Sequence, residues 1–351
     1  MRWTSLVLAA FVFAGCVLGD DGAYQRTSAP HETPGAHWEL VADPSTRGWS
    51  PAGLEAARRQ ASALGSSAVM VLDDGRLVAA WGDTTGRWYV ASVRKSLLSL
   101  LYGELVRSGR VSLDATLESV GLDEDTPLTP AERRATVRQL LTSTSGIYLP
   151  AAASDTPLPP RGSHQPGETF TYNNWGFNAA GTLFDERDPS VDLYEAFDAR
   201  LATPLGLEDF VRARDGRYER IAASRHAAYH FDLTARDLAR LGLLVSRQGR
   251  WGETEVVEAS WLSESTAPHV STGPREGSMG YGFMWWVCTE GSDLAAAGMP
   301  VGTVFANGNL NQFVAVIPGR KLVVVHRGPT GDVSWAQKAA LVRSLVEAAP
   351  R

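Results

Sequence analysis

The sequence predicts an α+β protein in which a mainly helical lobe is inserted into an α/β lobe. Paired strand patterns stand near both ends of the chain, at residues 68–81 and 312–326, and a helix pattern accompanies each pair. The residues from about 92 to 266 are mainly helical or loop-forming. We therefore expect one antiparallel sheet that is built from both ends of the chain and flanked by the N- and C-terminal helices.

The first elements follow the rules for helix and hairpin boundaries. A helix is expected from Pro51 to Leu64, because proline suits the first turn and Gly65 follows the end. The apolar runs 68–72 and 77–81 enclose Asp73-Asp74-Gly75-Arg76, a segment typical of a β-hairpin.

The last elements repeat this arrangement. Strands are expected at Gln312–Ile317 and Lys321–His326, and a closing helix is expected from Val333 to Ala348. The α/β lobe then comprises about 37–91 and 267–351, and the helical lobe about 92–266.

The N-terminus predicts export and membrane attachment. A short apolar run follows Arg2, and Phe13-Ala14-Gly15-Cys16 resembles a bacterial lipobox. We expect a signal peptide at 1–15, lipidation of Cys16 and a tether at 16–36, which would make the protein a cell-envelope lipoprotein facing the periplasm or the cell surface. A plain secretory peptide is the alternative. In both cases Cys288, the other cysteine, has no disulfide partner.

Composition and motifs exclude several functions. The net charge of -6 comes without a basic stripe, so no nucleic-acid partner is expected. His226 and His230 have the spacing of helical metal ligands, but no third ligand is evident, so we expect neither a metal nor a cofactor. No Gly-x-Ser-x-Gly elbow is present, which argues against an α/β-hydrolase.

The segment Ser92-Val93-Arg94-Lys95 is the strongest indication of chemistry. Lys95 is one of only three lysines among the 33 lysine and arginine residues, and the other two have no serine three positions earlier. Unlike arginine, a desolvated lysine can lose its proton and act as a base. Leucines at positions 97, 101 and 105 indicate a helix, on whose first turn Ser92 and Lys95 would be neighbours. Ser92 is therefore a candidate nucleophile whose amide is a candidate oxyanion donor, although an N-cap serine beside a solvated lysine would give the same spacing.

Five ordered segments carry a family resemblance over most of the chain from about Trp38. They lie at 91–95 (ASVRK), 136–146 (TVRQLLTSTSG), 166–174 (PGETFTYNN), 234–242 (TARDLARLG) and 281–286 (YGFMWW). The chain resembles the serine β-lactamase and penicillin-binding-protein superfamily, particularly the class C-like branch with its carboxylesterases and 6-aminohexanoate-oligomer hydrolases. The resemblance implies a β-lactamase/transpeptidase-like fold, with Tyr172 in proton exchange and Asn174 in substrate binding. Whether Lys95 or Tyr172 is the base during acylation stays open.

The chain departs from the family pattern at the third motif. Relatives that recognise penicillins carry a Lys-Thr-Gly strand, and counting along the sequence places that triplet near Thr303, where no cation stands. The resemblance implies a second oxyanion donor on this strand, for which the candidates are Ala306, Asn307 and Gly308. His326 with Arg327 could restore a positive charge, or could be a surface pair at the edge of the sheet.

These observations predict a serine hydrolase that forms an acyl-enzyme on Ser92 and cleaves ester or small amide bonds of a small or peptide-like substrate. A β-lactamase or D,D-carboxypeptidase whose anchor is Arg327 is one alternative. A noncatalytic binding or sensor lipoprotein is another.

Overall fold

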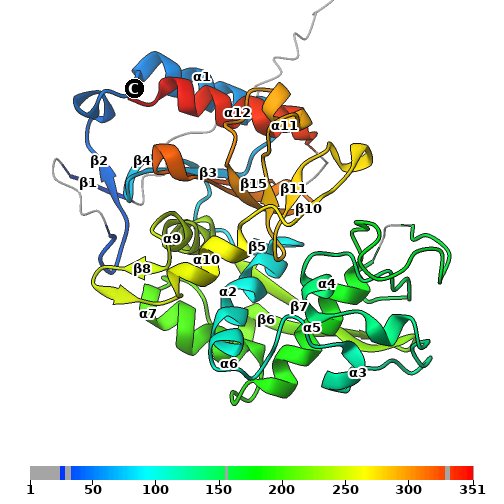
Figure 1. Ribbon diagram of the computed structural model, residues 1–351. Helices are drawn as coiled ribbons and strands as arrows, with labels where there is room; N and C mark the ends of the chain where they lie inside the picture. Colours follow the sequence, from blue (N-terminus) through cyan, green and yellow to red (C-terminus); the bar gives the residue numbers. More distant parts are fainter. Residues whose placement is uncertain (1–23, 28–32, 155–156, 329–332, 351) are drawn as a thin grey trace, which may run out of the picture.

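The computed structural model describes residues 24–27, 33–154, 157–328 and 333–350 (Figure 1). The predicted signal peptide, Cys16 and most of the predicted tether lie outside these residues. Within the described ranges, no helix has both the length and the apolar character needed to cross a membrane.

A large sheet joins the two ends of the chain. Among the described residues, ten strands form it, antiparallel except for the two pairs β1–β2 and β2–β4. In sheet order they are β1 (Gln25–Thr27), β2 (Glu39–Val41), β4 (Arg76–Gly82), β3 (Ala68–Asp73), β15 (Leu322–Arg327), β14 (Gln312–Ile317), β13 (Val304–Gly308), β12 (Trp286–Val287), β11 (Gly280–Tyr281) and β10 (Val270–Ser271). The pair at which the two ends of the chain meet, β3 with β15, aligns Asp73 with Leu322 and Ala68 with Arg327.

Helices cover both faces of this sheet, as Figure 1 shows. On one face α1 (Pro51–Ala63) packs against α12 (Trp335–Ala348), and on the other α9 (Ala235–Ser246) packs against β14, β15 and β3. Burial on both faces explains why every residue of β3, β14 and β15 is buried. The α+β fold class predicted from the sequence is confirmed.

The segment that follows the first hairpin contains more strand than expected. Its long strand β7 (Ser224–Leu233) pairs with β5 (Trp88–Tyr89) and β6 (Gly216–Ile221) in a second sheet, which the expectation of a mainly helical or loop-forming segment did not include. The two histidines in β7 point to the same face because strand side chains alternate, and that spacing also fits a helix. In addition, α9 packs against the large sheet, although its residues lie within the range expected for the helical lobe.

The remaining helices and strands are short, apart from α2 and α5. They are α2 (Val93–Arg107), α3 (Leu117–Val120), α4 (Val137–Leu141), α5 (Asn174–Arg187), α6 (Leu193–Phe197), α7 (Thr203–Leu205), α8 (Arg212–Asp215), β8 (Arg250–Trp251), β9 (Thr254–Glu255), α10 (Ala259–Ser265) and α11 (Asp293–Ala296), with single turns η1 (Pro44–Arg47), η2 (Glu132–Arg134), η3 (Asp198–Ala202), η4 (Pro274–Glu276) and η5 (Pro318–Arg320).

One part of the expected tether is structured. Residues Gln25–Thr27 form β1 at the edge of the large sheet, parallel to β2. Just before β1, the Tyr24 hydroxyl lies 2.7 Å from Oγ1 of Thr84. The ordered domain therefore begins earlier in the chain than the composition of the tether suggests.

Candidate active site

Ser92 lies at the start of α2 in a conformation that suits a nucleophile. The helix begins at Val93, and the Ser92 side chain makes no capping hydrogen bond. The preceding Ala91 has φ 49°, a left-handed conformation that is uncommon for a residue with a Cβ. The interpretation of Ser92 as a simple N-cap is therefore not supported, and the residue before it holds a strained backbone conformation of the kind found at functional sites.

Lys95 connects Ser92 to Tyr172. Its Nζ lies 2.7 Å from Oγ of Ser92 and 2.8 Å from Oη of Tyr172, donating to both oxygens. Lys95 is only 1% exposed, and the Nζ atom lies 4.6 Å from the centre of the Tyr172 ring and 4.9 Å from that of Phe177. A solvated surface lysine is thus excluded, and the three polar atoms form one hydrogen-bonded chain.

Tyr172 is held by the loop that follows α4. The Ser143 carbonyl accepts from the Thr171 amide at 2.9 Å, while the Ser143 hydroxyl donates to the Thr171 carbonyl at 2.7 Å. On the other side, the Trp286 ring stacks on Tyr172 with centroids 5.6 Å apart. Burial raises the pKa of Tyr172, although the hydrogen bond with Ser92 opposes this shift. Burial therefore favours the protonated phenol form of Tyr172.

The two asparagines after Tyr172 have different tasks. Asn173 caps α5 by accepting from the Trp175 amide at 2.9 Å, and its side chain also donates to the Ile147 carbonyl. Asn174 donates from Nδ2 to the Ala153 carbonyl at 2.6 Å, and its buried Oδ1 has no hydrogen-bond partner among the described residues. Asn174 is thus positioned to accept a hydrogen bond from a ligand.

The end of β13 lies directly against the nucleophile. A Cβ placed on Gly308 would come within 2.6 Å of the Val90 carbonyl oxygen and 3.0 Å of the Ser92 amide nitrogen. The counted position near Thr303 was therefore wrong, since Thr303 is buried and donates to the Pro300 carbonyl. Counting along the sequence failed because it could not show which strand residues touch the start of α2.

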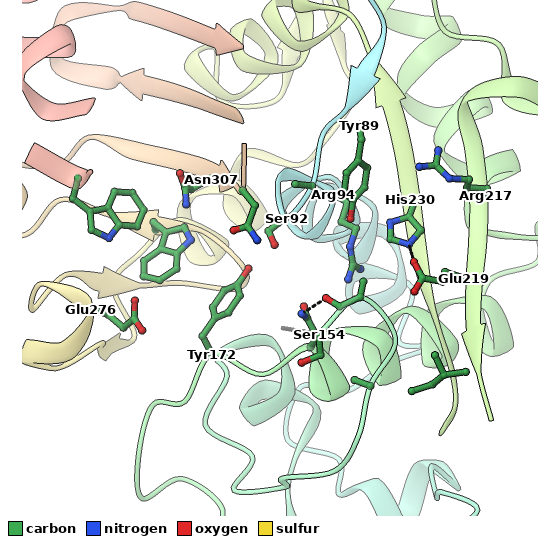
Figure 2. A pocket seen from close by; sticks show the side chains of 18 residues that line it. Tyr89, Ser92, Arg94, Ser154, Tyr172, Arg217, Glu219, His230, Glu276 and Asn307 are labelled. Atoms are coloured by element: carbon green, nitrogen blue, oxygen red, sulfur yellow. Dashed lines mark hydrogen bonds and ion pairs between the residues drawn. The ribbon is translucent and has the colours of Figure 1, made fainter. Parts of the chain in front are cut away.

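Ser92, Tyr172 and Asn174 line a cavity of about 720 Å³. In Figure 2, Ser92 stands between two sides of it, with Asn307 and Glu276 on one side and Arg94, His230, Glu219 and Arg217 on the other. Trp286 and Trp335 also line the cavity, with ring centroids 5.5 Å apart. Ala306 is 2% exposed and does not line it. The cavity thus combines an aromatic side with a charged side.

His326 and Arg327 do not reach this cavity. His326 is fully buried, where its Nε2 lies 2.6 Å from Oγ of Ser66 and its Nδ1 lies 2.8 Å from the Asn311 carbonyl oxygen. Burial lowers the pKa of His326 to about 4, so the ring is neutral at pH 7. Arg327 is also fully buried and donates to the Leu233 and Trp88 carbonyls. Neither residue supplies the substrate anchor that was considered from the sequence, nor do they form a surface pair.

Sequence reasoning missed two cations near the site. Arg94 lies inside the very motif that singled out Ser92, yet only its neighbours were considered. Lys338 of α12 donates from Nζ to Oδ1 of Asn307 at 2.7 Å, which places a positive charge behind the wall of the cavity. Lys338 is also one of the three lysines in the sequence, so the rarity of lysine that indicated a role for Lys95 was equally a signal for Lys338.

His226, the candidate metal ligand, and Cys288 are buried in the protein interior. His226 is buried, with Nδ1 3.0 Å from Oγ1 of Thr182 and Nε2 3.0 Å from the Asp123 carbonyl oxygen. In the described ranges, no group of three or more histidine, cysteine, aspartate or glutamate side chains could hold a metal ion. Cys288 is a buried free thiol.

The architecture and the comparisons define the class of protein. Helices cover both faces of the large sheet, and a second lobe is inserted between the two ends of the chain. This arrangement is the β-lactamase/transpeptidase fold. A model of the Beta-lactamase family matches residues 52–332, so the chain belongs to this family of β-lactamase-fold serine hydrolases. Among curated proteins, none matches the chain significantly.

Several solved structures share the fold at low sequence identity. A candidate 6-aminohexanoate-dimer hydrolase from Bacillus anthracis is 17% identical, with a TM-score of 0.63 over 83% of this chain and 80% of that one. A penicillin-binding-protein homologue from Caulobacter crescentus is 16% identical, with a TM-score of 0.62 over 86% and 98%. EstCE1, described as a hydrolase with promiscuous acyltransferase activity, is 16% identical, with a TM-score of 0.61 over 84% and 97%.

Proposed function

We propose that the protein is an esterase or small-amide hydrolase that forms an acyl-enzyme on Ser92. The observation that carries this proposal is the hydrogen-bonded chain from Ser92 through Lys95 to Tyr172 on the border of a cavity. A serine hydroxyl is a weak nucleophile unless a neighbouring base takes its proton. The chain supplies that base within hydrogen-bonding distance.

In this proposal each group carries out one step. The amine form of Lys95 takes the proton of Ser92 as Oγ bonds to the substrate carbonyl carbon. Because Tyr172 rests as a phenol, it serves as a proton relay, passing a proton to the leaving oxygen or nitrogen and regaining one from Lys95. Water then attacks the acyl-enzyme, and the proton transfers run in reverse to restore Ser92.

The developing oxyanion lies between α2 and β13 in this proposal. The Ser92 amide at the start of α2 is one donor, since helix N-termini favour negative charge. The end of β13 at Gly308 lies beside that amide, so a backbone amide at this end of β13 is the second donor.

A specific observation favours a second candidate, a β-lactamase or D,D-carboxypeptidase. The β13 residues beside the cavity include no lysine, which argues against penicillin recognition. However, Lys338 supports Asn307 from α12, and its positive charge could hold the carboxylate that such substrates carry. The esterase proposal is preferred because the carboxamide of Asn307 stands between this cation and the cavity.

One experiment separates the candidates. Purified protein is incubated with p-nitrophenyl acetate, nitrocefin or a fluorescent penicillin, and turnover and intact mass are recorded. Ester turnover without penicillin labelling is expected, and Ser92→Ala should abolish it. Penicillin labelling without ester turnover would establish the second candidate, whereas no reaction with any of the three would indicate the noncatalytic binding protein. Ser119→Ala, at an exposed position in α3, is the matched control.

We also propose that the protein is an exported lipoprotein anchored through Cys16. The lipobox-like sequence Phe13-Ala14-Gly15-Cys16 supports this proposal. In detergent phase separation, the full chain should partition into the detergent phase and Cys16→Ser should not. Equal partitioning of the two chains would contradict lipidation.

A further inference from the structure

One side of the cavity carries a buried charge without a counter-charge. Arg94 lines the cavity, is 1% exposed and forms no ion pair within the described residues. Its Nη2 donates to Oδ1 of Asn178 at 3.1 Å, and its guanidinium lies 4.5 Å from the centre of the Tyr229 ring. Its buried Nη1 has no hydrogen-bond partner. Because an arginine side chain is not deprotonated in proteins, the buried guanidinium carries a positive charge that has no counter-charge.

The nearby carboxylates are already engaged. Oε2 of Glu219 lies 2.8 Å from Nε2 of His230, and Asp232 is paired with Arg217. Both Glu219 and Arg217 have side chains that are 50% exposed, so water screens their charges. Neither carboxylate forms an ion pair with Arg94 in the described residues.

Other unsatisfied polar atoms gather around Arg94. Oδ1 of Asn174, Oη of Tyr229 and Nδ1 of His230 are all buried and lack a partner in the described part of the chain. Asn174 and His230 also line the cavity, as does Tyr89, whose ring centroid is 5.0 Å from that of His230. Buried polar groups are normally satisfied, so such a concentration at a cavity points to a missing ligand.

We propose that Arg94, in the surface that we call the Arg94 wall (Tyr89, Arg94, Asn174 and His230), binds a carboxylate on one arm of the substrate through its unpaired Nη1, while Oδ1 of Asn174 is left to accept from a donor group of the substrate. The proposal rests on the hydrolase function above and narrows its substrates to anionic esters or amides. A carboxylate fits better than a phosphate, because one guanidinium with a free Nη1 offers one charge and few donors. The arm that carries the carboxylate extends from Ser92 toward the charged side of the cavity (Figure 2).

Matched ester pairs test the proposal and locate the arm. Mono-p-nitrophenyl adipate is compared with its methyl ester, and 4-acetoxybenzoate with methyl 4-acetoxybenzoate. The first pair carries the carboxylate on the acyl arm and the second carries it on the leaving group. In the pair whose carboxylate reaches Arg94, the kcat/KM of the anionic member should exceed that of the neutral member by about tenfold to a hundredfold, as expected for a hydrogen bond to a charged group. Arg94→Gln should bring this ratio near one, and the control Arg250→Gln should retain it, because the Arg250 side chain is 52% exposed and does not line the cavity. No preference in either pair, or a preference that survives in Arg94→Gln, would overturn the proposal.

A binding measurement covers the case in which Arg94→Gln does not fold or no ester is cleaved. Calorimetric titration of adipate into Ser92→Ala protein should show saturable binding, and titration of uncharged adipamide should show none. Equal or absent binding of the two compounds means that water satisfies the Arg94 wall, which overturns the proposal. Because this titration needs no turnover, loss of the hydrolase function and loss of the carboxylate site give different results.

Discussion

Lys95 makes two short contacts from a buried position that an arginine in its place could not make. Its Nζ reaches both Ser92 and Tyr172 from a site that is almost completely buried. A compact amine can donate to two oxygens and can also exchange a proton, whereas a guanidinium keeps its proton and is larger. The scarcity of lysine elsewhere in the chain is consistent with this requirement.

Exchanging this residue for arginine should therefore remove catalysis while preserving charge. We expect Lys95→Arg to lower kcat/KM for p-nitrophenyl acetate by about a hundredfold to ten-thousandfold, the usual contribution of general acid–base catalysis. Lys321→Arg is the matched control, because the Lys321 side chain is 66% exposed and contacts only Asp74 among the ion pairs of the described residues. Near-normal turnover by Lys95→Arg would show that Lys95 does not transfer the proton.

At the residue scale, local patterns predicted the centre of the site but not its surroundings. Ser92 and Lys95 are three positions apart on one helix, so sequence spacing alone brings them together. Lys338 approaches Asn307 from a helix 31 positions away, and only the packing of α12 shows that contact. The burial of His326 likewise depends on neighbours from distant parts of the chain.

Among the elements, β13 and α2 have the most demanding contact. The end of β13 passes so close to the start of α2 that only glycine fits at position 308. The backbone atoms of Val90 and Ser92 form that contact, and they cannot move away without moving the nucleophile.

A single methyl group at this contact should therefore disturb the site. We expect Gly308→Ala to lower kcat/KM by on the order of a hundredfold, because small misplacements of reacting groups have effects of this size. Gly319→Ala is the control, since a Cβ at position 319 meets nothing within 4 Å. Thermal unfolding of both variants is measured alongside turnover. Wild-type activity in Gly308→Ala would mean that β13 does not position Ser92.

Element predictions from the sequence were best where the pattern was local. The structure has α1 at Pro51–Ala63 and β14 at Gln312–Ile317, within one residue of the expected bounds. The strands β6 and β7 were missed because the apolar and polar residues of β7 do not alternate: nearly all of them are buried. The expected start of the last helix at Val333 differs from the observed start at Trp335, where Ser334 caps α12.

At the scale of the molecule, a buried network ties three distant segments together. Nη2 of Arg240 in α9 donates to the carbonyls of Gly35 and Ala36 at 2.9 and 3.1 Å, and also pairs with Glu208 at 3.2 Å. Oδ1 of Asp237 accepts from the Glu208 amide at 2.8 Å, while its Oδ2 has no partner in the described residues. The N-terminal segment, the loop after α7 and α9 therefore depend on one cluster.

This network makes stability depend on pH. Burial raises the pKa of Asp237 to about 7, from an ordinary value of 3.8, so the folded state binds a proton more tightly than the unfolded state does. The resulting stabilisation is complete below pH 3.8 and is lost as the pH rises toward 7. In urea titrations at pH 5 and pH 8, Asp237→Asn should therefore lose less unfolding free energy between the two pH values than the wild type, by a few kcal/mol. The same loss in both proteins would contradict an elevated pKa.

The pairing of β3 with β15 has a consequence for how the protein forms. The first of these strands ends at Asp73 and the second begins at Leu322, so this part of the sheet cannot assemble until residues well beyond position 322 have been synthesised. Trp335, which lines the cavity, is made later still. A ribosome-bound or truncated chain can hold Ser92 and Lys95 on one helix, yet it lacks the sheet that brings β13 against them. Hydrolytic activity should consequently appear only once β15 and Trp335 have been synthesised and can fold, and the edge of β3 that pairs with β15 stays open to other strands until then.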